Sequence, residues 1–324
     1  RRSTDGGAIR TTHVEFGKRA SMGDGASGYN GLGSDHATHV TGTMIAAGVD
    51  PAAKGMAPKA NAIAFDWDND KSEVASAALN GMLVSNHSYG FMVRHPVTGR
   101  PLLPPSYFGG YLRESRSWDE IMHSAPFYLM VVAAGNEGLD EGANTKPLAP
   151  GFDKLTGHAT SKNGLVVANV RDVAINASGE IIGAVQIAPS SSEGPTDDLR
   201  VKPDISGNGF EVKSTLHLGI NGNNNKRYGQ NGWTGTSMAS PNVSGTLLLL
   251  QELFQSQNNT FMRSATLKGL ALHTADDAGR IGPDPIFGWG LLNARAAAQA
   301  IVGHGTTSYV SDCLLYTSPS PRDR

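Results

Sequence analysis

Apolar residues along this chain form short runs that polar and glycine-rich segments separate. Continuous apolar runs of four to eight residues, bounded by turn residues, are typical of strands buried on both faces. We predict such strands at residues 82–85, 127–134 and 165–170, and a further strand at residues 61–66, where the pattern alternates. Apolar residues spaced three or four positions apart predict helices instead, because they share one helix face. These are expected at residues 72–82, 113–123, 238–255 and 261–274.

Strands that alternate with helices favour a mostly parallel sheet covered by helices on both faces, so an α/β fold is predicted. Residues 173–188 depart from the alternation and predict a hairpin around the Asn-Ala-Ser-Gly turn at 176–179. Residues 96–111, rich in proline, glycine and aromatic side chains, are expected to form a surface insertion. Residues 23–28 match Gly-x-Gly-x-x-Gly, but the pattern predicts neither a strand before them nor a helix after them. A solvated loop is therefore expected there rather than a dinucleotide site.

Composition narrows the class of partner. The 324 residues include 27 Lys and Arg against 29 Asp and Glu, with a pI of about 6.6. Such a balance gives no electrostatic reason to bind nucleic acid or a membrane surface. No run of about 20 apolar residues exists that could span a bilayer. The 40 glycines and 39% hydrophobic content fit a compact, loop-rich α/β protein of one large domain or two small ones.

The most informative stretch is Gly-Thr-Ser-Met-Ala-Ser-Pro at residues 235–241, which leads directly into an apolar run at 243–254. A serine hydroxyl becomes a useful nucleophile when a turn exposes it and a base lies within hydrogen-bond reach. Ser237 is the candidate. The alternative is an ordinary serine cap at the start of a helix.

Three further segments carry chemistry that could complete such a site. Residues 35–43 read Asp-His-Ala-Thr-His-Val-Thr-Gly-Thr, and a histidine such as His36 can accept and return a proton near neutral pH. Asp5 lies in Thr-Asp-Gly-Gly, which alone is most often a turn. Asn136 follows the apolar run at 127–134, where its amide could stabilise an oxyanion. For His36 the alternatives are a metal ligand or a surface histidine, but neither an HExxH pattern nor a cysteine pair accompanies it.

Together, and in this order along the chain, these segments resemble the motifs of the subtilisin-like serine proteases. The resemblance covers residues 5 to about 302 and implies a three-layer α/β/α sandwich with a mostly parallel central sheet. It implies that Ser237 is the nucleophile, His36 the base and Asp5 the acid that orients it, in the chain order of that family. Asn136 and the backbone N–H of Ser237 would then stabilise the oxyanion, and His39 would be structural.

The chain departs from the family pattern at small positions. Ala37 stands where glycine is usual after the base, and Gly6 stands where serine or threonine is usual after the aspartate. His13 also falls one residue later than in the commonest pattern. These departures make the aspartate motif the loosest of the matches.

The resemblance also implies where a substrate lies. Ser88, Tyr89 and Gly90 would pair with an extended peptide backbone, as a strand edge can. Ala133, Ala134 and Gly135 would form the opposite wall of the pocket for the residue before the cut. Glu137 would lie near its rim, where it could tolerate Lys or Arg. Protein or peptide substrates are expected.

No cofactor is required by this chemistry, and no metal site is predicted. The polar loop at 221–225 could ligate calcium, but it lacks an acidic ligand set, so a plain surface loop is favoured.

The two ends of the sequence carry separate expectations. Residues 1–312 are expected to be one peptidase domain, truncated at its N-terminus. Residues 313–324, which contain the single cysteine, resemble the translation of a sequencing-library adaptor, with a disordered Ser/Pro tail as the alternative. The family is commonly secreted, so a secreted or cell-surface enzyme is expected although no signal peptide is visible.

Other functions fit the residues less well. A catalytically inactive scaffold would be indicated by a missing triad residue, and none is missing. The related sedolisins use glutamate in place of the base histidine. An esterase of the α/β-hydrolase type would need Gly-x-Ser-x-Gly and a histidine after the serine. The leading hypothesis is therefore a serine endopeptidase.

Overall fold

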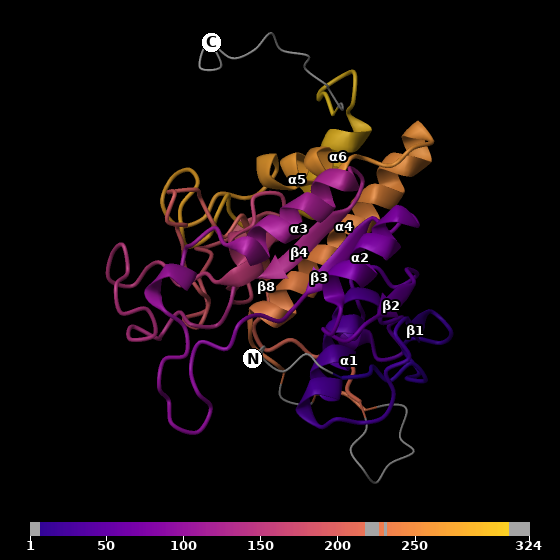
Figure 1. Ribbon diagram of the computed structural model, residues 1–324. Helices are drawn as coiled ribbons and strands as arrows, with labels where there is room; N and C mark the ends of the chain where they lie inside the picture. The colour runs from indigo at the N-terminus through magenta and orange to yellow at the C-terminus, as the bar shows by residue number, and fades with distance from the viewer. Residues whose placement is uncertain (1–6, 218–226, 230–231, 311–324) are drawn as a thin grey trace.

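The computed structural model describes residues 7–217, 227–229 and 232–310 (Figure 1). Its centre is a sheet of four parallel strands in the order β3-β4-β5-β8. The strands are β3 (Val84–His87), β4 (Leu129–Ala133), β5 (Leu165–Val170) and β8 (Ile205–Asn208). The expected α/β class with a parallel central sheet is confirmed.

Side chains of the central strands point alternately to the two faces, and both faces are buried. Leu129 and Val131 of β4 belong to the cluster on one face, which includes residues of α4, α5 and α6. Met130 and Val132 belong to the cluster on the other face, which includes residues of α2 and α3. The helices are α2 (Asp70–Leu79), α3 (Arg113–Ser124), α4 (Thr236–Asn258), α5 (Ser264–His273) and α6 (Ala294–Val302). The sheet is thus the middle of three layers.

Helix α1 (Leu32–Ile45) packs against α4 at the edge of this sandwich. The approach is close at Gly245 of α4, where a Cβ atom would lie 2.7 Å from Cβ of Met56 and 3.2 Å from the carbonyl oxygen of Met44. Next to α1, β1 (Ala20–Met22) and β2 (Ala62–Ala64) form a separate parallel pair. The remaining elements are short: η1 (Pro51–Ala53), η2 (Pro105–Tyr107), η3 (Gly157–Thr160), β6 (Ala174–Ile175) and β7 (Ile181–Ile182).

The sequence pattern predicts most of these elements but misplaces some. The strand at 165–170 is found as predicted, and β3 lies two residues beyond the predicted 82–85. The predicted strand at 61–66 is only the three-residue β2, outside the central sheet. The hairpin at 173–188 is reduced to β6 and β7 around its turn. The statement that no strand precedes residues 23–28 is wrong, because β1 ends at Met22; the glycines themselves lie in a loop.

Helix α6 was not predicted; it is only nine residues long and alanine-rich, and it buries Ala297 and Ile301 on one face. Its start is fixed locally: the Asn293 side chain accepts a hydrogen bond of 2.8 Å from the backbone N–H of Ala296. The tail at 313–324 lies outside the described residues. Among the described residues, no helix is both long and apolar enough to cross a membrane.

Candidate active site

A small pocket lies where β3, β4 and the first turn of α4 meet, at the carboxyl ends of the two strands. Its volume is about 60 Å³. The residues expected to bind substrate, together with Asn136 and Ser237, all lie around it. The lining residues are Ser88, Tyr89, Gly90, Phe91, Ala133, Ala134, Gly135, Asn136, Glu137, Thr156, His158, Ala159, Thr236 and Ser237.

Ser237 is not a helix cap. The N-cap of α4 is Gly235, which has no side chain to cap with, and Ser237 is the second residue of the helix. Its side chain is half-buried at the pocket, and its hydroxyl donates a hydrogen bond of 3.2 Å to the carbonyl oxygen of Ser88. The serine-cap alternative is therefore excluded.

The backbone at Ser237 depends on a proline four residues later. Pro241 lies inside α4 and has no N–H, so the carbonyl of Ser237 cannot receive the usual i+4 hydrogen bond. The Ser88 hydroxyl donates to that carbonyl instead, at 2.9 Å. Ser88 and Ser237 thus exchange two hydrogen bonds, which fix the nucleophile candidate against the segment that follows β3.

Asn86 of β3 ties the same strand to α4. Its amide oxygen accepts hydrogen bonds from the hydroxyls of Ser240 (2.7 Å) and Ser244 (3.1 Å). Its amide nitrogen donates to the Ser88 hydroxyl at 2.9 Å. One side chain therefore joins the strand that leads to the pocket with the helix that carries Ser237.

Asn136 is exposed at the mouth of the pocket, and Thr236 sets its orientation. The backbone N–H of Thr236 donates to Oδ1 of Asn136 at 3.0 Å, and the Thr236 hydroxyl lies 3.2 Å from the same oxygen. Because a donor faces Oδ1, the NH₂ end of the amide is the end available to a ligand. The Thr236 hydroxyl also lies 3.1 Å from the carbonyl oxygen of Gly135.

His36 lies in the first half of α1, and the segment that enters α4 approaches it. The ring of Trp233, four residues before Ser237, lies 6.1 Å from the His36 ring and is stacked on His39 at 4.9 Å. His39 is fully buried, and its Nε2 is 3.0 Å from the carbonyl oxygen of Val212. Burial lowers the pKa of His39 to about 4, so it is neutral at physiological pH.

Asp5 lies outside the described residues. The described chain that follows it packs against the start of α1: a Cβ atom on Gly7 would lie 2.6 Å from the backbone nitrogen of Ser34. The backbone N–H of Arg10 donates to the Thr38 hydroxyl at 3.0 Å.

Glu137 extends along the pocket wall. The Ser192 hydroxyl donates to Oε2 of its carboxylate at 2.8 Å, and the backbone N–H of Glu137 donates to the same hydroxyl at 3.0 Å. Burial raises the pKa of the Glu137 carboxyl. The expected position near the pocket is therefore found, with the carboxylate anchored to Ser192.

Behind the pocket, Tyr89 is linked to a buried polar network. Its hydroxyl donates to Asp70 at 3.1 Å and lies 2.8 Å from Nδ1 of His87, whose Nε2 lies 2.7 Å from the Ser85 hydroxyl. Burial holds the pKa of His87 well below its usual value. Tyr89 therefore lines the pocket while its phenol end is fixed between α2 and β3.

Residues 221–225, the loop considered for calcium, lie outside the described residues. Within the described ranges, the structure contains no group of three or more His, Cys, Asp and Glu side chains arranged to hold a metal ion.

A sequence model of the subtilase family matches residues 13–290, which is most of the chain. This chain belongs to the subtilase family. The family consists of serine-type endopeptidases, so the arrangement of Ser237 and Asn136 around the pocket agrees with the family's chemistry.

Several relatives of this subtilase are named as proteases. It is 28% identical to bacillopeptidase F of Bacillus subtilis (strain 168) over 287 residues, which is 85% of this chain and 17% of that protein. It is 30% identical to alkaline protease 1 of Emericella nidulans over 158 residues, 48% of this chain and 36% of that protein. It is also 30% identical to the minor extracellular protease Vpr of Bacillus subtilis over 128 residues, 38% of this chain and 15% of that protein. The chain thus spans a minor part of each of these relatives.

Solved structures agree on the fold. The patellamide maturation protease PatA superposes with a TM-score of 0.63 at 19% identity, covering 92% of this chain and 95% of that one. The prenylagaramide maturation protease PagA gives a TM-score of 0.61 at 18% identity, covering 91% and 90%.

Sequence reasoning missed several residues of this subtilase's pocket. Thr236 belongs to the nucleophile motif at residues 235–241. That motif was the available signal for its hydrogen bond to Asn136. Phe91 directly follows the substrate segment, which was the only signal for it. Thr156, His158 and Ala159 come from a segment without a motif, and only the fold brings them to the pocket.

Proposed function

We propose that this subtilase is a serine endopeptidase that hydrolyses peptide bonds in proteins or peptides, with Ser237 as its nucleophile. The observation that carries the proposal is the position of Ser237 in the first turn of a 23-residue helix, at a pocket that Asn136 also lines. The N-terminus of a helix favours developing negative charge, which a tetrahedral intermediate carries.

In the proposed reaction, the Ser237 Oγ attacks the carbonyl carbon of the scissile bond while the imidazole of His36 takes the hydroxyl proton. His36 then gives a proton to the departing amine as the C–N bond breaks, which leaves an acyl-enzyme that water hydrolyses. Asp5 would orient His36. This last assignment is supported by the sequence motif and by the packing of Gly7, two residues after Asp5, against Ser34, two residues before His36.

The oxyanion would be stabilised by the NH₂ group of Asn136 and by the backbone N–H of Ser237. The support is the hydrogen bond from Thr236 to Oδ1 of Asn136, which leaves the NH₂ end of the amide as the end available to a ligand. The chemistry consumes only water and requires no cofactor. We also propose that the enzyme acts outside the cell or at its surface, in line with a relative whose name describes an extracellular protease.

The test is covalent labelling. A fluorophosphonate or sulfonyl fluoride probe should modify the purified protein at Ser237, and peptide mapping by mass spectrometry should find the adduct there. Ser237→Ala should abolish both labelling and peptide hydrolysis. For subtilisin, a member of this family, the corresponding loss in kcat is about 2 × 10⁶-fold, a known figure rather than one calculated from this structure.

The matched control is Ser240→Ala, because Ser240 is buried three residues along the same helix and donates to Asn86. That variant should still be labelled at Ser237. Labelling at Ser88 or Ser240 would refute the assignment of the nucleophile. A folded protein that neither reacts with the probe nor cleaves casein would instead indicate an inactive scaffold.

A further inference from the structure

Phe91 and His158 line the pocket, and no family motif predicts either residue. Phe91 lies between β3 and the insertion at residues 96–111, and His158 belongs to η3. A Cβ atom on Gly157 would lie 2.6 and 2.7 Å from two ring atoms of Phe91, so the ring rests directly on the Gly157 backbone. His158 is 5% exposed, and its ring centroid is 5.2 Å from that of Tyr89.

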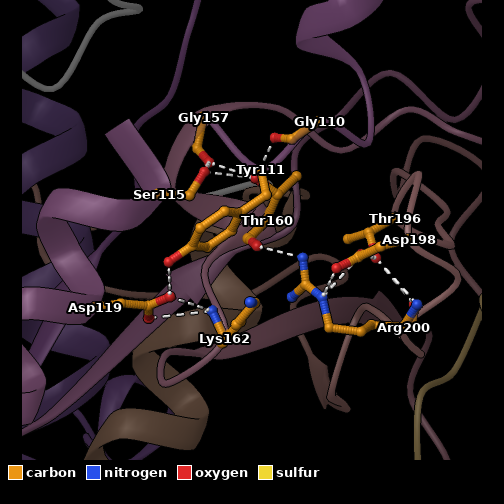
Figure 2. Close-up of polar contacts among 10 residues, drawn as sticks. All are labelled: Gly110, Tyr111, Ser115, Asp119, Gly157, Thr160, Lys162, Thr196, Asp198 and Arg200. Atoms are coloured by element: carbon orange, nitrogen blue, oxygen red, sulfur yellow. Dashed lines mark hydrogen bonds and ion pairs between the residues drawn. The ribbon is translucent and has the colours of Figure 1, made fainter. Parts of the chain in front are cut away.

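The segment under the Phe91 ring is held in place from behind. The Ser115 hydroxyl of α3 donates to the carbonyl oxygen of Gly157 at 2.9 Å. The Thr160 hydroxyl lies 2.8 Å from the carbonyl oxygen of Gly110, and Nη2 of Arg200 donates to the carbonyl of Thr160 at 3.0 Å. Figure 2 shows these groups gathered around η3. With both ends of η3 bonded to other segments, the pocket cannot deepen by a small shift of this turn.

A second set of contacts in Figure 2 fixes the end of the insertion. The Tyr111 hydroxyl donates to Asp119 of α3 at 2.9 Å, and Nζ of Lys162 lies 4.5 Å from the centre of the Tyr111 ring. Burial raises the pKa of Tyr111 to about 12, so the phenol stays protonated and keeps this bond.

The segment from Phe91 to Phe108 is anchored to the part of the chain that follows Glu137. Val93 and Phe108 form a small core with Ala143, and Arg94 forms an ion pair with Asp140. The Phe91 ring also meets Tyr107 edge-on at 6.0 Å. These contacts hold the Phe91 ring at the pocket and leave it little freedom to swing away.

The space that remains is small. Across from Phe91, the Glu137 carboxylate lies against Gly135, where a Cβ atom would be only 2.5 Å from Oε2. The pocket volume of about 60 Å³ is well below the roughly 150 Å³ of a cavity that holds one benzene molecule. The pocket is therefore better matched to a small side chain such as alanine, serine or valine than to a phenyl ring.

We infer that Phe91 is a specificity-determining residue that limits this subtilase to substrates with a small side chain before the scissile bond. The inference rests on the proposed function, because it takes the pocket around Ala133 and Gly135 as the site for that residue. It names a substrate class that the family motifs do not give.

The experiment uses fluorogenic peptides that differ only in the residue before the cut: alanine, valine, leucine or phenylalanine. The purified wild type should cleave the alanine and valine peptides with kcat/KM at least about tenfold above the phenylalanine peptide, the scale by which pocket fit discriminates side chains. Phe91→Ala should raise the ratio of kcat/KM for the phenylalanine peptide to kcat/KM for the alanine peptide by about tenfold or more. Phe91→Leu, a milder truncation, should give a smaller shift in the same direction.

Val97→Ala is the matched control, because Val97 is 86% exposed in the same insertion and does not line the pocket. It should keep the wild-type preference. A wild type that prefers phenylalanine, or a Phe91→Leu variant that folds with an unchanged preference, would refute the inference while leaving the protease function intact. A wild type that cleaves none of the peptides or casein would refute the proposed function itself.

Discussion

At the scale of single residues, the proposed catalytic site is arranged by a few reciprocal hydrogen bonds. Pro241 removes one donor from α4, and the Ser88 hydroxyl supplies another to the Ser237 carbonyl. Thr236 engages the oxygen of Asn136 and so decides which end of that amide can meet a substrate. Each of these residues orients a neighbour, and the orienting groups come from both sides of the nucleophile.

Asn136→Ala should lower kcat by roughly 10²–10³-fold with little change in KM, because the lost donor serves the charge that develops in the transition state. The magnitude is the one known for the corresponding donor of subtilisin and is not calculated from this structure. Steady-state kinetics on one peptide would measure it. Asn80→Ala, at an exposed helix end, is the control and should behave as the wild type. A variant with normal kcat and a raised KM would make Asn136 a binding residue instead.

At the scale of elements, the site is a junction between β3 and α4, and Asn86 is the side chain that joins them. Its amide oxygen is the acceptor for two serine hydroxyls of α4 that are both fully buried. A buried hydroxyl that loses its partner costs about 1–3 kcal/mol. The strand and the helix are therefore coupled in both stability and function.

Asn86→Ala should lower the free energy of unfolding by about 1–3 kcal/mol, because it leaves the buried Ser240 hydroxyl without its acceptor, whereas the Ser244 hydroxyl keeps the carbonyl oxygen of Ser240. It should also reduce kcat, because Ser88 loses the donor that orients its hydroxyl. Urea unfolding followed by circular dichroism would measure the change in the free energy of unfolding. Ser256→Ala, on the exposed part of α4, should change stability by less than about 0.5 kcal/mol. Equal stabilities of the Asn86 and Ser256 variants would contradict this coupling.

The sequence predicts the elements that carry the chemistry better than those that only connect them. Val-rich β5 and the long α4 have strong apolar patterns and are found close to where they were predicted. β1 has three residues and pairs only with β2, so the local pattern does not reveal it, whereas β2 is predicted but at twice its length. The residues that line the pocket also fall into those that sequence motifs predict and those that they do not. Ser237 and Asn136 stand in motifs, whereas Phe91 and His158 reach the pocket only through tertiary packing, which no local spacing encodes.

At the scale of the whole molecule, four buried histidines make folding sensitive to acid. Among the described residues, His13, His39, His87 and His158 are each at most 5% exposed, and burial lowers the pKa of all four. In the unfolded chain a histidine has a pKa of about 6.5 and takes up a proton more readily. The unfolded state therefore binds more protons below that pH, and stability is lost as the pH falls.

We expect the free energy of unfolding to fall between pH 6.5 and about 4, the lowered pKa of His39. His39 alone should contribute on the order of 3 kcal/mol to this change, at about 1.4 kcal/mol per pH unit. Urea unfolding curves at pH 7.5, 6 and 5 would measure the slope. His123→Gln, an exposed histidine on α3, should leave the slope unchanged, whereas His39→Gln should reduce it. A stability that stays constant from pH 7.5 to 5 would contradict the argument.

The bonds around Ser237 join segments that are very distant along the chain. Ser88 and Ser237 are 149 residues apart, and Gly135 and Thr236 are 101 residues apart. Contacts of such long range form late in folding, because the loops that they close must first lose their entropy. Under the proposed function, a newly made chain therefore has no working nucleophile until these distant segments have met. Such a chain cannot cleave itself before that part of the fold has assembled.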